Sequence, residues 1–147
     1  MLLDALLAWL HFLCIFTLVG ALVAELVLYR REMDATRLAQ LRRVDMIFGI
    51  AAGLVVASGV LRVIFGLKGA GFYLDNPFFW AKMGLFVVVA LLSIAPTLHY
   101  LRLASEGGVT VPEDAYLRTR TFLGLEAALV ACIPLLATLL AHGYQRF

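Results

Sequence analysis

Residues 78–101 read FFWAKMGLFVVVALLSIAPTLHYL, a stretch in which Lys82 is the single Asp, Glu, Lys or Arg. About 20 largely apolar residues suffice for an α-helix to cross the hydrocarbon core of a bilayer. Three further stretches of this kind occur, at residues 5–29, 46–66 and 121–142. Backbone groups in lipid must bond within their own segment, so each stretch is predicted to be a helix. We therefore expect an all-α membrane protein, a four-transmembrane-helix bundle in which residues 1–147 form a single domain.

The composition agrees with this class and excludes several others. Of the 147 residues, 63% are apolar and 15% are charged, whereas soluble proteins average about 45–50% and about 25%. The net charge of +2 is too small to favour nucleic acid as a partner. The sequence contains no GxSxG nucleophile motif and no HExxH metal motif. The glycines of residues 66–71 follow an apolar helix rather than a strand, which does not favour a phosphate-binding loop.

The distribution of arginine predicts the orientation of the chain. Residues 30–45 and 102–120 contain eight arginines, whereas the loops and tail of the other side carry only Lys68 and Arg146. Positively charged loops remain in the cytoplasm in most membrane proteins. We therefore expect both arginine-rich loops to be cytoplasmic and both termini to lie outside.

Local signals predict two helix starts and one packing surface. Asp45 is expected to cap the second span, and Asn76-Pro77 to cap and begin the third. Gly49 and Gly53 form a GxxxG motif, which allows close approach of a second helix. Packing inside the bundle is the simpler interpretation of this pair, and homodimerisation is the alternative.

Four ionisable residues from four different spans are predicted to lie at a similar depth on the outer side. They share this depth because consecutive helices alternate in direction. Ionisable groups inside a membrane are costly and therefore suggest function. These residues are His11, Arg62, Lys82 and His142.

A second layer, nearer the cytoplasmic side, contains two carboxylates. Glu25 and Glu126 lie inside the first and fourth spans, and Asp45 and His99 are close to the same depth. His11 and Glu25 are 14 residues apart, which places them about 40° apart around one helix. One interpretation is structural pairing of the carboxylates with Arg30 and Arg120, and the other is proton transfer.

The outer residues also have structural interpretations. Lys82 and Arg62 are close enough to the interface to extend their charges into the headgroup region, and His142 can be an ordinary interfacial residue. His11 is too short to do so and lies on an apolar helix. It is either a core histidine bonded to a neighbouring carbonyl or a metal ligand, since a neutral imidazole suits haem iron.

The segment of residues 59–102 resembles a small bacterial family of membrane proteins without an assigned function, and the similarity extends over nearly the whole chain. The matching pieces are Leu61-Arg62, Phe72-Tyr73-Leu74, Asn76-Pro77, Phe79-Trp80-Ala81-Lys82, Leu92-Ser93-Ile94 and Pro96-Thr97.

More distantly, the layout is similar to HemJ, the four-helix protoporphyrinogen IX oxidase of bacteria, which binds haem b. HemJ proteins carry an early histidine, a lysine near the start of the third helix and a glutamate within the fourth. Here these positions correspond to His11, Lys82 and Glu126. The resemblance implies a redox role in a bacterial cytoplasmic (inner) membrane, with His11 as the iron ligand and Lys82 and Glu126 as catalytic residues.

Two main functions therefore remain open. The first is a haem- or porphyrin-binding protein, in which His11 binds the metal and Arg62, Lys82 and His142 help to bind the cofactor or a quinone or porphyrinogen substrate. The second is a non-enzymatic membrane partner or assembly module that uses the GxxxG surface, with a homo-oligomer as one form. A channel is a third hypothesis, but four helices leave little room for an aqueous pore.

Overall fold

Four long helices and one short helix make up residues 1–106 and 110–142, the part of the chain that the computed structural model describes. The long helices are α1 (Leu2–Leu28), α2 (Ala35–Phe65), α4 (Pro77–Ser105) and α5 (Glu113–Ala141), and no strand is formed in these two segments. Each long helix is apolar enough over 18 residues to cross a membrane. The predicted all-α class and its four spans are confirmed.

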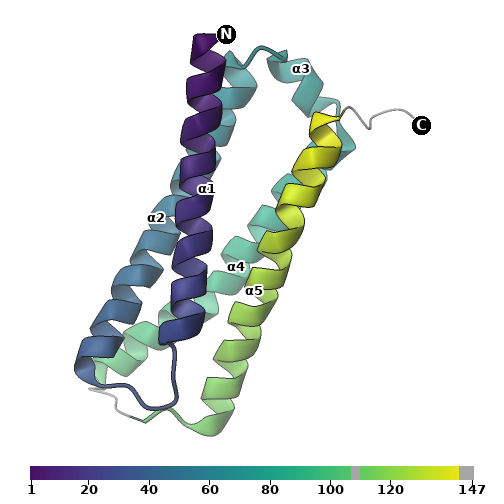
Figure 1. The fold of residues 1–147 in the computed structure, drawn as a ribbon. Helices are drawn as coiled ribbons and strands as arrows, with labels where there is room; N and C mark the ends of the chain where they lie inside the picture. The colour runs from purple at the N-terminus through teal and green to yellow at the C-terminus, as the bar shows by residue number, and fades with distance from the viewer. Residues whose placement is uncertain (107–109, 143–147) are drawn as a thin grey trace.

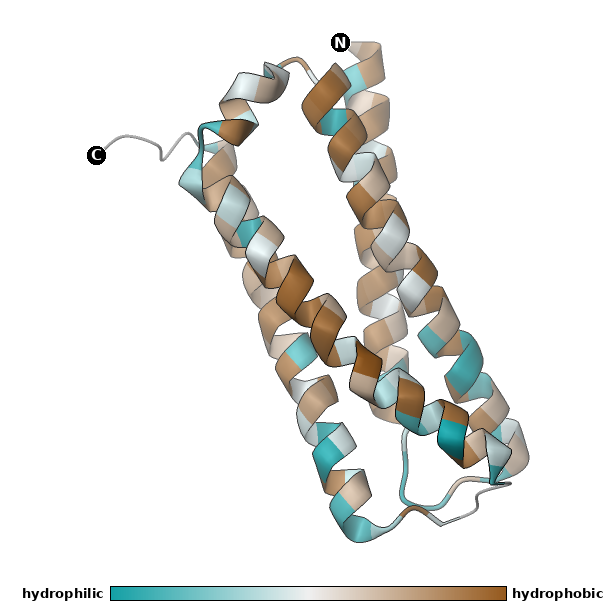
Figure 2. Cartoon of the chain, turned by 180° about the vertical axis from the view of Figure 1, so that it is seen from behind, coloured by the Kyte–Doolittle hydropathy of each residue, from teal (hydrophilic) through white to brown (hydrophobic). Residues whose placement is uncertain are grey.

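The long helices form two antiparallel hairpins, because α1 packs mainly against α2 and α4 mainly against α5 (Figure 1). Helix α3 (Gly69–Leu74) joins the hairpins at the end that also holds the N-terminus, which we call the terminal end. The α1–α2 connection and the junction of α4 with α5 lie at the opposite, arginine-rich end. Hydrophilic residues gather toward this end, and the middle of the helices is largely hydrophobic (Figure 2).

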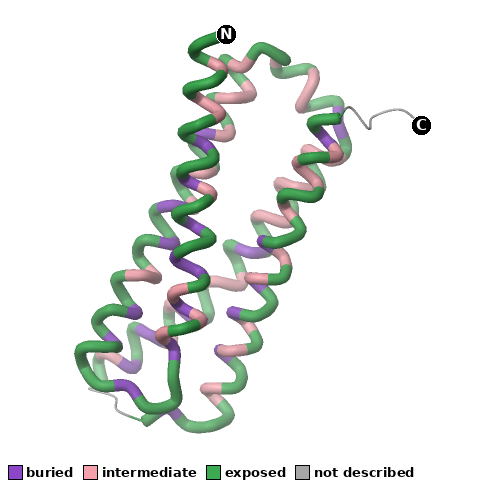
Figure 3. The backbone as a smooth tube through the Cα atoms, viewed as in Figure 1, coloured by how far each residue is buried: buried purple, intermediate pink, exposed green. Residues whose placement is uncertain are grey.

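The shared core lies in the half of the bundle that is nearer the arginine-rich end. In α1 the buried core residues lie from Leu18 onward, and in α4 they lie from Val89 onward. In α2, which runs the other way, they lie up to Ala51. Helix α5 contributes Leu123 and Val130. Buried positions are correspondingly frequent in this half (Figure 3). The terminal half is less tightly covered, and this is where His11 lies.

Two helices begin earlier than hydropathy predicts. Helix α2 starts at Ala35 rather than Met46, and α5 starts at Glu113 rather than Thr121. The expected loops 30–45 and 102–120 are therefore mostly helical. The reason is that Arg, Ala, Gln and Leu are good helix formers in water as well as in lipid, so the helix extends beyond the apolar stretch that hydropathy identifies.

The capping prediction is wrong for one helix and confirmed for another. Asp45 lies inside α2, and the cap is Asp34, whose carboxylate accepts a hydrogen bond from the Arg37 N–H at 2.7 Å. Asn76 caps α4 as predicted: its Oδ1 accepts from the Phe78 N–H at 2.8 Å, and Pro77 is the first residue of the helix.

Replacing Asn76 by alanine is expected to lower stability by about 1 kcal/mol, because an N–H of the first helical turn loses its acceptor. Asn76 is fully buried, so water cannot readily replace that bond. Circular-dichroism melting in detergent measures the change. The Asn76→Ser variant keeps a capping oxygen and should lose less; an equal loss in both variants would show that the cap contributes little.

The interpretation of Gly49 and Gly53 as packing residues inside the bundle is wrong. Both glycines are exposed, and a Cβ atom added to either one would have no neighbour within 4 Å. The motif lies on the outer surface of α2. Gly59 is different, because a Cβ there would lie 3.4 Å from Cε1 of His11. Gly59 therefore allows α1 and α2 to approach closely at His11.

Candidate functional site

His11 is buried between α1 and α2, with only 9% of its surface exposed. Its Nδ1 lies 2.8 Å from the hydroxyl of Ser58. The hydroxyl of Ser58 also lies 2.7 Å from the carbonyl of Leu54. The same hydroxyl lies 3.2 Å from the carbonyl of Val55, and which of Nδ1 and Ser58 donates depends on the tautomer of His11. The tautomer in which Nδ1 donates to Ser58 carries its lone pair on Nε2, which is the form that binds a metal.

Two cations accompany this histidine. Lys82 of α4 and Arg62 of α2 are half-buried, and their charges interact with His11 and with each other. Nε of Arg62 is buried and lacks a hydrogen-bond partner. Among the described residues neither cation forms an ion pair with a carboxylate. We call His11, Arg62 and Lys82 the outer cluster; its uncompensated charge suits an anionic group.

The fourth residue of the predicted outer layer lies elsewhere. His142 is exposed at the C-terminal end of α5, where its Nδ1 is 2.8 Å from the carbonyl of Thr138 in its own helix. No described contact joins it to His11. The structure thus brings three of the four predicted residues together.

The second group of predicted residues is also brought together, in the half nearer the arginine-rich end. Glu25 and Glu126 are 2% and 1% exposed, and each has one carboxylate oxygen without a hydrogen-bond partner. Tyr100 donates to the other oxygen of Glu25 at 3.3 Å. Asp45 interacts electrostatically with both glutamates and accepts from Thr97 at 2.7 Å. We call Glu25, Asp45, Glu126 and Tyr100 the carboxyl cluster.

Structural pairing of these glutamates with arginine is wrong. Arg120 donates instead to the carbonyl of Leu26 at 2.7 Å, and Arg30 donates to the carbonyl of Val27 at 3.2 Å. The single ion pair of the described residues joins the α1–α2 connection to the first residue of α5, with 3.3 Å between Arg31 and Glu113. Among the described residues no cation therefore forms an ion pair with the carboxyl cluster, and Arg42 acts on Asp45 only electrostatically.

An aromatic cluster lies beside the carboxyl cluster. Tyr29 is fully buried; its ring centroid lies 5.4 Å from that of Tyr116 and 5.7 Å from that of Tyr100. Burial raises the pKa of the Tyr29 hydroxyl, which therefore stays protonated. This hydroxyl lies 3.0 Å from Nε2 of His99. The contacts connect the end of α1 to both helices of the second hairpin.

The sequence interpretation missed Ser58, Tyr29 and Tyr100. A usable signal existed for Ser58, because it precedes Arg62 by one helical turn and so shares its face of α2. Tyr100 lies one turn after Pro96 and so shares its face of α4. Tyr29 had no such signal, since its partners come from helices that follow it by 70 or more residues.

The outer cluster and the carboxyl cluster are separate sites. His11 and Glu25 are 14 residues apart on α1, a rise of about 21 Å. The buried residues between them on this helix are Cys14, Leu18, Ala21 and Leu22; Cys14, one turn after His11, is the one among these with a proton-transferring group, and three apolar residues separate it from Glu25. Direct proton transfer along α1 from one cluster to the other is therefore not supported.

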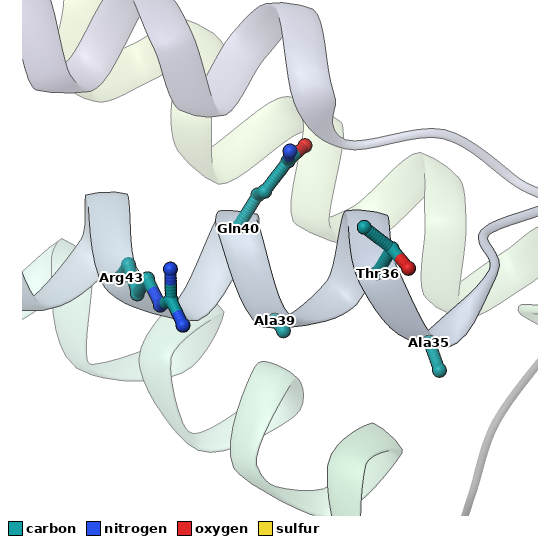
Figure 4. A pocket seen from close by; sticks show the side chains of 5 residues that line it. All are labelled: Ala35, Thr36, Ala39, Gln40 and Arg43. Atoms are coloured by element: carbon teal, nitrogen blue, oxygen red, sulfur yellow. The ribbon is translucent and has the colours of Figure 1, made fainter.

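The described residues form no group of three or more His, Cys, Asp or Glu that could enclose a metal ion. A surface hollow of about 370 Å³ does not involve this site. It is lined by residues of the first turns of α2: Ala35, Thr36, Ala39, Gln40 and Arg43 (Figure 4).

Four spanning helices that bury ionisable side chains at two depths define an integral membrane protein with specialised polar sites inside the bilayer. Residues 3–145 match the family described as predicted membrane protein (DUF2214), and the chain belongs to this family. No curated protein and no solved structure matches the chain.

Proposed function

We propose that this membrane protein binds haem b or a related porphyrin at the outer cluster and takes part in HemJ-like redox chemistry. One observation carries the proposal: His11 is buried beside Ser58 and is acted on by two cations, Arg62 and Lys82, that form no ion pair with a carboxylate among the described residues. The resemblance of His11, Lys82 and Glu126 to HemJ positions supports the same function. A bound haem would supply one-electron chemistry.

Each residue of the outer cluster has a role in this proposal. His11 binds the iron through Nε2. Arg62 and Lys82 hold carboxylates of the cofactor, or of a porphyrinogen or quinone-linked substrate, through charge-assisted hydrogen bonds. Lys82 also orients the substrate. Glu126 and Glu25 relay protons at the arginine-rich, cytoplasmic side.

The proposal includes an orientation. The protein lies in a bacterial cytoplasmic membrane with both termini outside, because the eight arginines of residues 30–45 and 102–120 favour the cytoplasm. The outer cluster then faces the outer leaflet. Cysteine labelling of Ser105→Cys and Leu67→Cys in whole cells distinguishes the two sides, after both native cysteines are replaced by serine.

Absorption spectra of the purified protein test the function. Protein from haem-supplied cells, or apoprotein titrated with hemin in detergent, should show a Soret band and reduced-state bands of haem b after dithionite. The His11→Ala variant should lose the Soret band. His99→Gln is the matched control, because it changes a histidine of the other end and should retain the band.

Two results would overturn this function. The first is folded wild-type protein that shows no Soret band after hemin titration. The second is an unchanged spectrum in the His11→Ala variant, which would make His11 a packing residue.

The outward position of Gly49 and Gly53 favours a second candidate, a non-enzymatic assembly module or homo-oligomer. These two glycines leave open space on the surface of α2 that another helix can fill. Cross-linking in membranes tests it: Gly49→Leu/Gly53→Leu should abolish a cross-linked species that Gly20→Leu, a glycine of α1 with equally open surroundings, retains.

A further inference from the structure

The second hollow of the surface lies between α4 and α5, at the arginine-rich end. Its volume is about 310 Å³. Helix α4 contributes residues spaced one turn apart, which share one face, and α5 contributes three residues of its second and third turns. The lining residues are Ala95, Leu98, His99, Arg102, Arg118, Thr119 and Phe122.

Positive charge is concentrated at one part of this hollow. Arg102 lies in the last turn of α4 and Arg118 in the second turn of α5. Both arginines interact electrostatically with His99, as does Glu106, the one carboxylate that acts on it. Among the described residues neither arginine forms an ion pair. Two guanidinium groups from facing helices thus share one hollow and lack a carboxylate partner.

The hydrogen bonds of His99 add a donor. Nε2 of His99 lies 3.0 Å from the hydroxyl of Tyr29. When the phenol donates to Nε2, the ring proton of the neutral imidazole lies on Nδ1, which is then a hydrogen-bond donor. Arg102, Arg118 and, in this tautomer, His99 therefore offer donors to the hollow, and Glu106 is the one carboxylate that acts on His99.

The remaining lining residues are apolar and lie deeper along the helices. Leu98 and Ala95 precede Arg102 by one and two turns on α4, and Phe122 follows Arg118 by one turn on α5. Because α4 and α5 are antiparallel, both sets lie on the membrane side of the arginines. Leu98 is 48% exposed, so this wall is open to lipid. Guanidinium donors at headgroup depth above an apolar wall match a phospholipid better than a free ion.

We propose that this hollow binds one anionic phospholipid, with Arg102 and Arg118 on its phosphate and Leu98 and Phe122 against its acyl chains. The site is independent of the outer cluster, which lies at the other end of the bundle. A bound phosphate would explain why Arg102 and Arg118 line the same hollow without a carboxylate partner. Arginine suits this role because its planar fork can bind two phosphate oxygens at once.

Native mass spectrometry and thermal shift of the delipidated protein in detergent test the site. The probes are palmitoyl-oleoyl phosphatidylglycerol, phosphatidylcholine with the same chains, and inorganic phosphate. We expect one tightly bound phosphatidylglycerol and a rise in melting temperature, weak binding of phosphatidylcholine, and no competition by millimolar phosphate. The Arg102→Gln/Arg118→Gln variant should bind phosphatidylglycerol about 30-fold more weakly, at the usual contribution of a basic residue near an anionic surface.

The matched control is Arg37→Gln/Arg43→Gln, which removes two charges from the same end and includes the arginine of the α2 hollow. It should keep wild-type affinity within about twofold. An equal loss of phosphatidylglycerol affinity in both double variants would overturn the site, because it would mean that the lipid is attracted by the overall positive charge of this end. Equal binding of both lipids, or displacement of the lipid by inorganic phosphate, would also overturn it. If the glutamine variant fails to fold, Arg102→Lys/Arg118→Lys replaces it: this variant keeps the charge and should still bind more weakly than wild type.

Discussion

Replacing Tyr29 by alanine is expected to lower the free energy of unfolding by about 3–5 kcal/mol, the range for truncating a large buried aromatic residue. Tyr29 is fully buried, and its ring contacts three other rings, those of His99, Tyr100 and Tyr116. Those partners belong to α4 and α5, whereas Tyr29 follows α1. The truncation would therefore remove the packing that holds the two hairpins together at the arginine-rich end.

Unfolding in mixed detergent, followed by circular dichroism, measures this loss. The Tyr29→Phe variant keeps the ring and loses only the contact of the hydroxyl with His99, so it should cost about 1 kcal/mol. Tyr73→Ala is the matched control, because Tyr73 is half-buried at the terminal end. If Tyr29→Ala costs no more than Tyr73→Ala, the aromatic cluster is not what joins the hairpins.

Replacing Glu126 by methionine is expected to stabilise the fold by about 1–3 kcal/mol, which is the cost of burying a polar group without a partner. Glu126 is 1% exposed, and its buried Oε1 forms no hydrogen bond. Methionine has a similar length and fills the same space without a polar atom. The same change should abolish proton-coupled activity if Glu126 has the catalytic role that we propose. A gain in stability together with a loss of activity would show that Glu126 is retained for function although it lowers the stability of the fold.

The neighbouring carboxylate provides the contrast. Glu25 accepts a hydrogen bond from Tyr100, whose side chain is fully buried. The Glu25→Met variant would leave that phenol without its acceptor, so it should lower stability by about 1–3 kcal/mol. A loss of the same size in Glu126→Met would instead mean that Glu126 has a stabilising partner. Haem spectra should not change in either variant, since both residues lie far from His11.

The spans, the helix caps and the depth of the ionisable residues can be predicted from the sequence to different degrees. Hydropathy alone identifies the four spans, and the cap at Asn76 follows from Asn-Pro before an apolar run. The common depth of His11, Arg62 and Lys82 follows from the alternation of helix direction. The start of α2 at Ala35 does not follow from hydropathy, because a helix continues into water wherever its residues favour helix and a cap such as Asp34 is available.

The sequence by itself therefore determined that the chain crosses the membrane four times as helices and which ionisable residues lie at each depth. Only the tertiary structure decided the neighbours: Ser58 beside His11, Tyr100 rather than arginine beside Glu25, and Gly49 and Gly53 on the outside. The physical reason is that lipid tails and neighbouring helices are equally apolar, so the hydrophobic pattern sets where a helix lies along the membrane normal and not how it is rotated. Rotation is chosen by packing and by the few polar groups that must find partners, and these come from helices far apart in sequence.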